Sequence, residues 1–260
     1  MLAEFNLKDV NLSGALQQLQ ENIRKEPANA KLRIFLFQLL AVLGQWDRAL
    51  NQLNVLGQMD ASTLPMVHAY RAAIQCEALR SDIFAGKRAP LVFGDPEPWM
   101  VMLIETLRLD AAGETDKAER TRAQAFEEAS ATKGTLNGEP FEWIADADMR
   151  LGPMLEAVIN GSYYFVPFHR IKKIKIDPPS DLRDSVWMPA SFMWANEGEA
   201  FGLIPTRYAG TLEKGDDAQL LSRRTDWDGN FGIGQRIFAT DAGECALMDV
   251  RLIELDSTGS

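Results

Sequence analysis

The sequence predicts an α+β protein with a helical array of the tetratricopeptide type over residues 1–135, followed by a small, strand-rich, barrel-like domain over residues 136–260. In the first part, apolar residues recur every three or four positions, as they do on one face of a helix. A five-residue spacing from Gly to Ala also occurs twice in that part. In the second part, short runs of alternating apolar and polar residues are separated by turn sequences, a pattern typical of antiparallel strands.

The helical pattern begins at Ser13, a residue type suited to cap a helix. A second helix is expected from Ala30, and its apolar residues lie on nearly all sides, which indicates that neighbours pack around it. Gly44 ends this helix and a third begins at Trp46. A further helical stretch covers residues 64–79.

The spacing from Gly44 to Ala49 returns between Gly113 and Ala118. Tetratricopeptide repeats are helix pairs of about 34 residues, and a small residue allows the two helices to cross closely. We therefore expect about three helix pairs over residues 10–130.

Stacked helix pairs rotate slightly and leave a concave face that the first helices line. A mostly apolar face of this kind suits an amphipathic helix as ligand. The residues expected on this face are Ile34, Gln38, Ala41, Met100 and Ile104. The alternative is that the N-terminal helix or the second domain covers them and that they belong to the core.

The pattern changes beyond residues 131–141, a segment with two Gly and one Pro that we interpret as a linker. Residues 154–159 are expected to form a short helix that Asn160 and Gly161 end, and residues 163–168 the first strand. Later strands are expected at 188–194, 200–204, 236–239 and 246–255. Several short antiparallel strands within one small region predict a small barrel or a rolled sheet.

The net charge is −10, and residues 136–260 carry most of it, with 12 Lys and Arg against 20 Asp and Glu. This acidity argues against a nucleic-acid groove, which needs cations to replace counterions. Cys76 and Cys245 form no CxxC, so neither a disulfide framework nor a zinc site is expected. Glu4, Asn6 and Lys8 interrupt the start of the chain, and no apolar run is long enough to span a membrane. We expect a cytoplasmic protein without cofactor or small-molecule substrate.

Asp146 and Asp148 form an Asp-x-Asp pattern, which in some sugar-nucleotide transferases holds a divalent cation. That chemistry needs a nucleotide-binding βαβ unit and a third oxygen ligand, and the sequence indicates neither. We therefore expect no metal, and a structural role in which one Asp caps the next turn or pairs with Arg150.

A second charged cluster contains Arg183 between Asp181 and Asp184. An Arg between two carboxylates fixes a loop through paired charges, and no nucleophile is nearby in the sequence. We predict that both clusters are structural and that no residue is catalytic. The alternative is an enzyme that acts through the region of Asp146, Asp148 and Arg183.

Several rarer motifs stand in one order along the chain: Trp143-Ile-Ala-Asp-Ala-Asp-Met-Arg-Leu-Gly-Pro-Met-Leu-Glu156, Asn160-Gly-Ser-Tyr-Tyr164 with Pro167-Phe168, Asp181-Leu-Arg-Asp-Ser-Val-Trp-Met-Pro189, Pro205-Thr-Arg-Tyr208, Thr225-Asp-Trp227 and Gly234-Gln-Arg236. In this the sequence resembles the ImpE family, also called TagJ or SciE, of type VI secretion accessory proteins. The first half resembles the tetratricopeptide-like portion of the family, so the resemblance covers nearly the full length.

This resemblance implies a cytoplasmic protein without known enzymatic activity. Members of the family are described as binding the N-terminal helix of the small sheath subunit, TssB, which links them to the sheath and indirectly to the ClpV ATPase that disassembles it. The residues alone indicate less: a helical groove, no catalytic set and no export signal. A structural subunit that oligomerises through its apolar helices is a third hypothesis.

Overall fold

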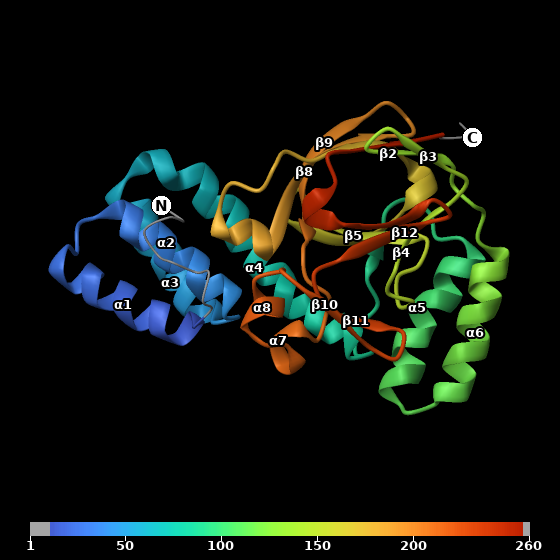
Figure 1. Ribbon diagram of the computed structural model, residues 1–260, viewed down its shortest axis with the longest axis horizontal. Helices are drawn as coiled ribbons and strands as arrows, with labels where there is room; N and C mark the ends of the chain where they lie inside the picture. The colour runs from blue at the N-terminus through green and yellow to red at the C-terminus, as the bar shows by residue number, and fades with distance from the viewer. Residues whose placement is uncertain (1–10, 257–260) are drawn as a thin grey trace.

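A computed structural model describes residues 11–256, so the first residues, with Glu4, Asn6 and Lys8, lie outside the described part. Within these residues, six long helices and the two-residue strand β1 come first, and the other strands follow α6 (Figure 1). The helices are α1 (Leu12–Lys25), α2 (Ala30–Val42), α3 (Trp46–Met59), α4 (Leu64–Phe84), α5 (Pro98–Ala111), α6 (Thr115–Glu128), α7 (Thr211–Lys214) and α8 (Asp217–Leu220).

Asparagine side chains begin the first two helices. Asn11 caps α1, where its Oδ1 accepts a hydrogen bond from the backbone N–H of Gly14 at 2.8 Å. Ser13, the cap predicted from the sequence, instead lies in the first turn. Asn29 caps α2 by accepting from the N–H groups of Lys31 and Leu32. These side chains satisfy backbone donors that have no partner within the helix.

The repeated Gly-to-Ala spacing corresponds to repeated geometry. Gly44 and Gly113 have φ angles of 65° and 74°, which Gly adopts without strain. Ala49 and Ala118, five residues later, are both completely buried. The tetratricopeptide-like array predicted for the first part of the chain is therefore confirmed.

The strands form a nine-stranded sheet in the order β1-β6-β5-β9-β8-β7-β14-β2-β3, a three-stranded sheet in the order β13-β12-β4, and the hairpin β10–β11. They are β1 (Leu91–Val92), β2 (Gly134–Leu136), β3 (Glu139–Phe141), β4 (Ile144–Asp146), β5 (Met154–Ile159), β6 (Ser162–Pro167), β7 (Ile171–Lys175), β8 (Trp187–Trp194), β9 (Glu199–Pro205), β10 (Thr225–Asp228), β11 (Phe231–Gly234), β12 (Ile237–Thr240), β13 (Gly243–Ala246) and β14 (Leu252–Leu255). Short 3-10 turns are η1 (Ala61–Thr63), η2 (Phe168–Arg170), η3 (Leu182–Ser185) and η4 (Leu247–Asp249).

β5 is a strand where the sequence predicts a short helix. It pairs antiparallel with β6, and Asn160 and Gly161 form the hairpin turn with φ angles of 50° and 78°. An Asn-Gly pair between apolar runs is a strong hairpin signal, whereas a run of six residues is too short to define a helical period. The prediction of a helix was therefore wrong.

The long sheet separates two apolar cores. On one of its faces, Met154, Val158 and Phe165 pack against the helices. On the other, Leu155 and Ile159 belong to a second core that the three-stranded sheet also contacts. The long sheet curls around this second core but stays open, with β1 and β3 at its edges, so the fold is a rolled sheet rather than a closed barrel (Figure 1).

The helical and strand-rich parts share structure across the predicted boundary at residues 135 and 136. β1, which belongs to the first part, pairs in parallel with β6 of the second. β2 itself spans residue 135. Leu182 and Trp187 of the second part lie in the same apolar core as α2, α3 and α4. The helices therefore share one apolar core with the strand-rich part, in addition to the second core on the other face of the long sheet.

Candidate functional site between the helices and the sheet

Two of the residues expected to line an open groove, Gln38 and Ala41 of α2, are buried, with exposed fractions of 3% and 0%. The Nε2 of Gln38 donates a hydrogen bond to Oδ1 of Asp181 at 3.2 Å. Residues 181–187 of the strand-rich part therefore cover this face of α2. This arrangement corresponds to the alternative in which the second domain covers the concave face.

Charged side chains shape the covering segment. Asp184 is buried, and its Oδ2 accepts hydrogen bonds from the backbone N–H groups of Ser180 at 2.7 Å and Asp181 at 2.9 Å. Arg183 donates to Oδ2 of Asp181 at 2.5 Å, and its guanidinium lies 4.6 Å from the centre of the Tyr70 ring. The charges thus hold a tight turn against α4.

Trp187 anchors the end of the segment. It is completely buried, and its ring lies 5.7 Å from that of Trp46 in α3 and 5.8 Å from that of Tyr70 in α4. Its indole N–H donates to Oε1 of Glu77 at 2.8 Å. Because aromatic side chains bury large apolar areas, this contact is a principal attachment between helices and sheet.

The remaining groove candidates lie apart from these contacts. Met100 is completely buried in α5, while Ile104 of α5 and Ile34 of α2 are half-buried. α5 packs on α6 as a separate helix pair, and Figure 1 shows this pair on the opposite side of the molecule from α2. The five residues therefore do not form one open surface.

A network of buried charges connects α4 to both sheets. Glu156 of β5 accepts hydrogen bonds from Nε of Arg80 and, at 3.0 Å, from Nη2 of the same residue. It also accepts from the hydroxyl of Tyr163 and from Arg236. Arg236 pairs in addition with Asp146 of β4. Glu156 and Arg236 are both completely buried, so each charge needs these partners.

Burial and the neighbouring charges move the pKa values of Glu156 and Asp146 in opposite directions. Burial alone would raise the pKa of Glu156, but Arg80 and Arg236 outweigh it and hold the pKa at about 2. Burial raises the pKa of Asp146 to about 7, against the attraction of Arg236 and with a smaller contribution from the neighbouring Asp148. Burial also raises the pKa of the Tyr163 hydroxyl, as does the Glu156 carboxylate.

The oxygens of Asp146 and Asp148 are occupied by donors from the protein. Asp146 accepts from the N–H of Asp148 at 2.9 Å and from Arg236. Oδ1 of Asp148 accepts from the N–H and the Nε of Arg150, and Oδ2 from the N–H of Gly232 at 2.8 Å. This Asp-x-Asp therefore fixes the turn after β4 to the β10–β11 hairpin.

The two charged clusters that the sequence singles out are separate. Within residues 11–256, no hydrogen bond or ion pair joins Asp146, Asp148 or Arg150 to Asp181, Arg183 or Asp184. An acid–base pair built from Asp148 and Arg183 consequently has no geometric support.

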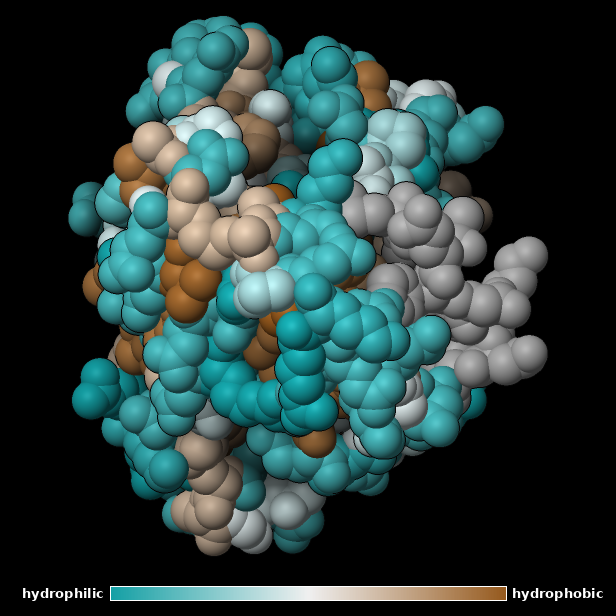
Figure 2. All heavy atoms as spheres, turned by 90° about the vertical axis from the view of Figure 1, so that its left-hand side faces the viewer, coloured by the Kyte–Doolittle hydropathy of each residue, from teal (hydrophilic) through white to brown (hydrophobic). Residues whose placement is uncertain are grey.

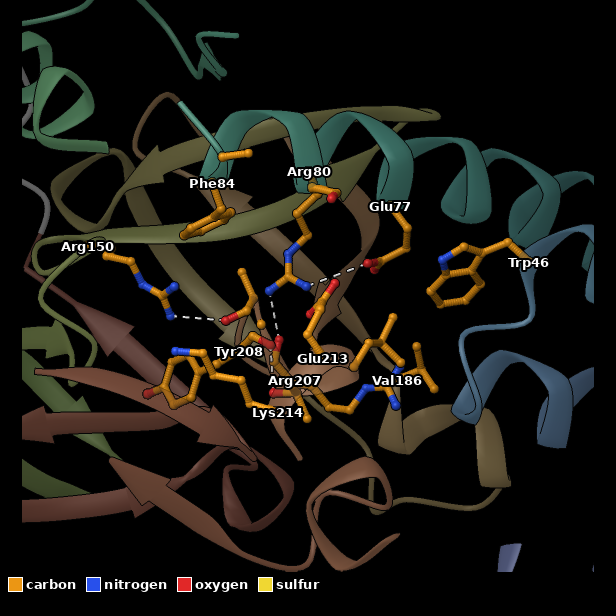
Figure 3. A pocket seen from close by; sticks show the side chains of 16 residues that line it. Trp46, Glu77, Arg80, Phe84, Arg150, Val186, Arg207, Tyr208, Glu213 and Lys214 are labelled. Carbon is orange, nitrogen blue, oxygen red and sulfur yellow. Dashed lines mark hydrogen bonds and ion pairs between the residues drawn. The ribbon is translucent and has the colours of Figure 1, made fainter. Parts of the chain in front are cut away.

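A pocket of about 340 Å³ lies where α4 faces residues 207–214 (Figure 3). Its lining includes Trp46, Glu77, Arg80, Phe84, Arg150 and Arg207. Arg80 lies between Glu77 and Glu156, and Arg150 pairs with Asp148. These cations are thus already neutralised by the protein.

Arg207 is bound differently, because backbone carbonyls hold its guanidinium. It donates to the carbonyl of Val42 at 2.6 Å and to that of Leu220 at 3.0 Å. Val42 is the last residue of α2, where the helix dipole favours a cation. Burial lowers the pKa of Arg207 to about 10, which still leaves it charged at neutral pH. Arg207 therefore ties the end of α2 to the strand-rich part.

Sequence reasoning missed the centre of this network: Arg80, Glu156, Arg207 and Arg236. The available signal was the single carboxylate of Glu156 within the apolar run 154–159. In the helix predicted there, such a residue has an ordinary solvent-exposed place, but in a strand buried on both faces it needs a buried cation.

The described residues were also compared with the requirements of a metal site and of a membrane-spanning helix. Within residues 11–256, no group of three or more His, Cys, Asp and Glu side chains is arranged to hold a metal ion. No helix in the same range has both the length and the hydropathy needed to cross a bilayer.

Known proteins resemble this chain over nearly its whole length. Residues 138–254 match the family described as ImpE protein, and residues 7–74 match a tetratricopeptide repeat family. The type VI secretion system accessory component TagJ of Pseudomonas aeruginosa is 51% identical over 259 residues, which are 99% of this chain and 92% of the relative. A crystal structure of a Vibrio parahaemolyticus protein matches with a TM-score of 0.87 and 25% identity, covering 98% of this chain and 97% of that one. The chain therefore belongs to the ImpE family of TagJ-like proteins.

Proposed function

We propose that this protein is a cytoplasmic, non-catalytic accessory component of a type VI secretion system and that it binds the N-terminal helix of the small sheath subunit, TssB. Through the sheath it is linked indirectly to ClpV. The observation that carries the proposal is the 51% identity to TagJ along nearly the full chain. The helical array supports it, because such arrays commonly present surfaces to peptide helices.

The buried charges support an adaptor rather than an enzyme. Asp146, Asp148 and Glu156 are saturated by donors from the protein, and these pairs join helices to sheets. Catalytic carboxylates instead need access to a substrate. These buried charged residues thus join α4 to the two sheets.

The partner helix needs a surface other than the filled concave face. Figure 2 shows the end of the array that α1, α2 and α3 form, where apolar side chains lie in narrow strips between hydrophilic ones. Of the five residues expected to contact a partner, Ile34 and Ile104 retain partial exposure. Ile34 lies on α2 and Ile104 on α5, on opposite sides of the molecule, so we propose that one partner helix contacts only one of them.

Isothermal titration calorimetry with a synthetic peptide of the sheath subunit's N-terminal helix tests the proposal. We expect saturable binding with a Kd of about 100 μM or tighter, which corresponds to at least about 5.5 kcal/mol. A peptide of the same composition in scrambled order, which has lost its apolar stripe, serves as control. The absence of binding to folded protein at about 100 μM peptide would refute the proposed partner.

A further inference from the structure

The face of the long sheet that packs on the helices extends beyond them. Trp187 of β8 and Leu203 of β9 lie on this face, in the core that the helices share with the sheet. Because every second side chain of a strand points to the same face, Ser191 and Phe201 lie on it as well. These two residues are opposite each other in the β8–β9 pair, and both are exposed. The helices therefore leave the hairpin end of β8 and β9 uncovered, and Figure 1 shows this end at the top of the molecule, well above α5 and α6.

Phe201 is the most exposed of the large apolar side chains within residues 11–256, with an exposed fraction of 66%. It borders a hollow of about 420 Å³ on the sheet surface, together with Ser191 and Met193 of β8. A sheet face that stays in water normally carries polar side chains. An aromatic ring beside a hollow instead favours contact with another protein surface.

The side chains around Phe201 form two rows across the sheet. From β9 through β8 and β7 to β14, the first row is Phe201, Ser191, Lys175 and Leu252, and the second is Glu199, Met193, Lys173 and Glu254. The six of these residues on β7, β8 and β9 all line the hollow, and we call them the Phe201 patch: Phe201, Ser191, Lys175, Glu199, Met193 and Lys173.

The Phe201 patch carries one unpaired charge of each sign. Lys173 is already paired, because its Nζ lies 2.8 Å from Oε1 of Glu254. Lys175 and Glu199 have no ion-pair partner within the part of the chain that the structure describes. They lie at opposite corners of the patch, two strands and one row apart. A partner surface of a single sign of charge would leave one of the two unmatched.

We propose that two copies of the chain associate through the Phe201 patch, related by a twofold axis. In a twofold contact, a residue that meets a second residue of the other copy is itself met in the same way by that copy. Lys175 of each copy then pairs with Glu199 of the other, and the two Phe201 rings pack at the facing hollows. One cation and one anion around an apolar centre thus make the patch complementary to itself.

The size of the Phe201 patch determines how strong this contact can be. Three strands about 4.8 Å apart make a surface only roughly 15 Å wide. Contacts that bury less than about 1,200 Å² belong to the weak, transient class. We therefore expect a reversible dimer with a dissociation constant of about 10–100 μM. The contact uses the sheet and leaves the helical array free, unlike oligomerisation through the apolar helices.

Sedimentation velocity of the full chain, at concentrations from about 1 to about 300 μM, measures this dimer. Phe201→Ser removes the aromatic ring, and Lys175→Glu places two carboxylates opposite each other. The double variant Lys175→Glu with Glu199→Lys exchanges the two charges and restores their pairing. Trp227→Ser is the matched control, because Trp227 is 42% exposed and does not line the hollow. Circular dichroism and thermal melting establish that each variant is folded.

We expect Phe201→Ser and Lys175→Glu each to weaken the dimer at least about 10-fold, and the double variant to bind within about 3-fold of wild type. Trp227→Ser should change the dissociation constant less than about 2-fold. A wild-type protein that stays monomeric at about 300 μM would overturn the proposal. So would a dimer that the Phe201 and Lys175 variants leave unchanged, or one that the exchange of charges fails to restore.

Calorimetry with the sheath peptide distinguishes this proposal from the proposed function. Peptide binding should be the same in folded Phe201→Ser protein as in wild type, so either proposal can fail without the other. A loss of peptide binding in that folded variant would show that the peptide, rather than a second copy, occupies the patch, and this result would also overturn the dimer.

Discussion

Replacing Glu156 by Gln measures how strongly the buried charges hold helices and sheet together. Gln keeps the size of the side chain but removes the negative charge between Arg80 and Arg236, which stay buried. Breaking a buried ion pair in this way costs about 3–5 kcal/mol, a large part of the roughly 5–15 kcal/mol by which domains are stable. At about 2–4 °C per kcal/mol for a protein of this size, the melting temperature should fall by about 6–20 °C.

Urea denaturation followed by circular dichroism is the assay for this variant. Glu139→Gln is the control, because Glu139 lies exposed on the edge strand β3 and should lose less than about 0.5 kcal/mol. If Glu156→Gln is destabilised no more than that control, the charge network contributes little and the argument for it fails.

The loss of stability caused by Glu156→Gln should depend on pH. The folded-state pKa of Glu156 is about 2, below the ordinary value of 4.5, so its stabilising effect is complete above pH 4.5. The effect should be lost as the pH falls from 4.5 towards 2, since folding then requires the protonated side chain to give up its proton. The difference in unfolding free energy between wild type and Glu156→Gln should therefore shrink across this range, and a constant difference would contradict the assigned ion pairs.

Three other changes test separate features. Arg207→Met removes the hydrogen bonds to the carbonyls of Val42 and Leu220 and should cost about 1.5–3 kcal/mol in urea denaturation; a loss below about 0.5 kcal/mol would contradict its role. Gly161→Val places a β-branched residue at a φ of 78° and should lower stability by about 1–2 kcal/mol, whereas an unchanged melting temperature would argue against the β5–β6 turn. Millimolar Mg²⁺ should leave the melting temperature unchanged, because Asp146 and Asp148 already accept from protein donors; a saturable rise would instead indicate a cation site.

Local patterns in the sequence predicted the parts of the fold that depend on local spacing. The offset from Gly44 to Ala49 located a helix crossing, and the alternation over 188–194 matched β8. The proximity of Asp148 and Arg150 in the chain suggested the pair that the structure contains. In each case the interacting residues are close in sequence, so the contact can be predicted from periodicity or short spacing.

Long-range contacts were not predicted, because the two residues of each contact lie far apart in the sequence. Arg80 and Glu156 are 76 residues apart, and Gln38 and Asp181 are 143 apart. A single sequence carries no signal that pairs such distant positions. β1 was also missed, because two residues define no period and its place depends entirely on the neighbouring β6.

The way residues 181–187 fill the concave face has a practical consequence for work with fragments. A truncated chain that stops at residue 135 would lack Trp187. The rings of Trp46 and Tyr70, which Trp187 contacts, would then be exposed to water. Newly exposed apolar surfaces of this kind associate with many unrelated proteins. Interaction screens that use the helices alone are therefore prone to false positives, and the intact chain is the proper bait.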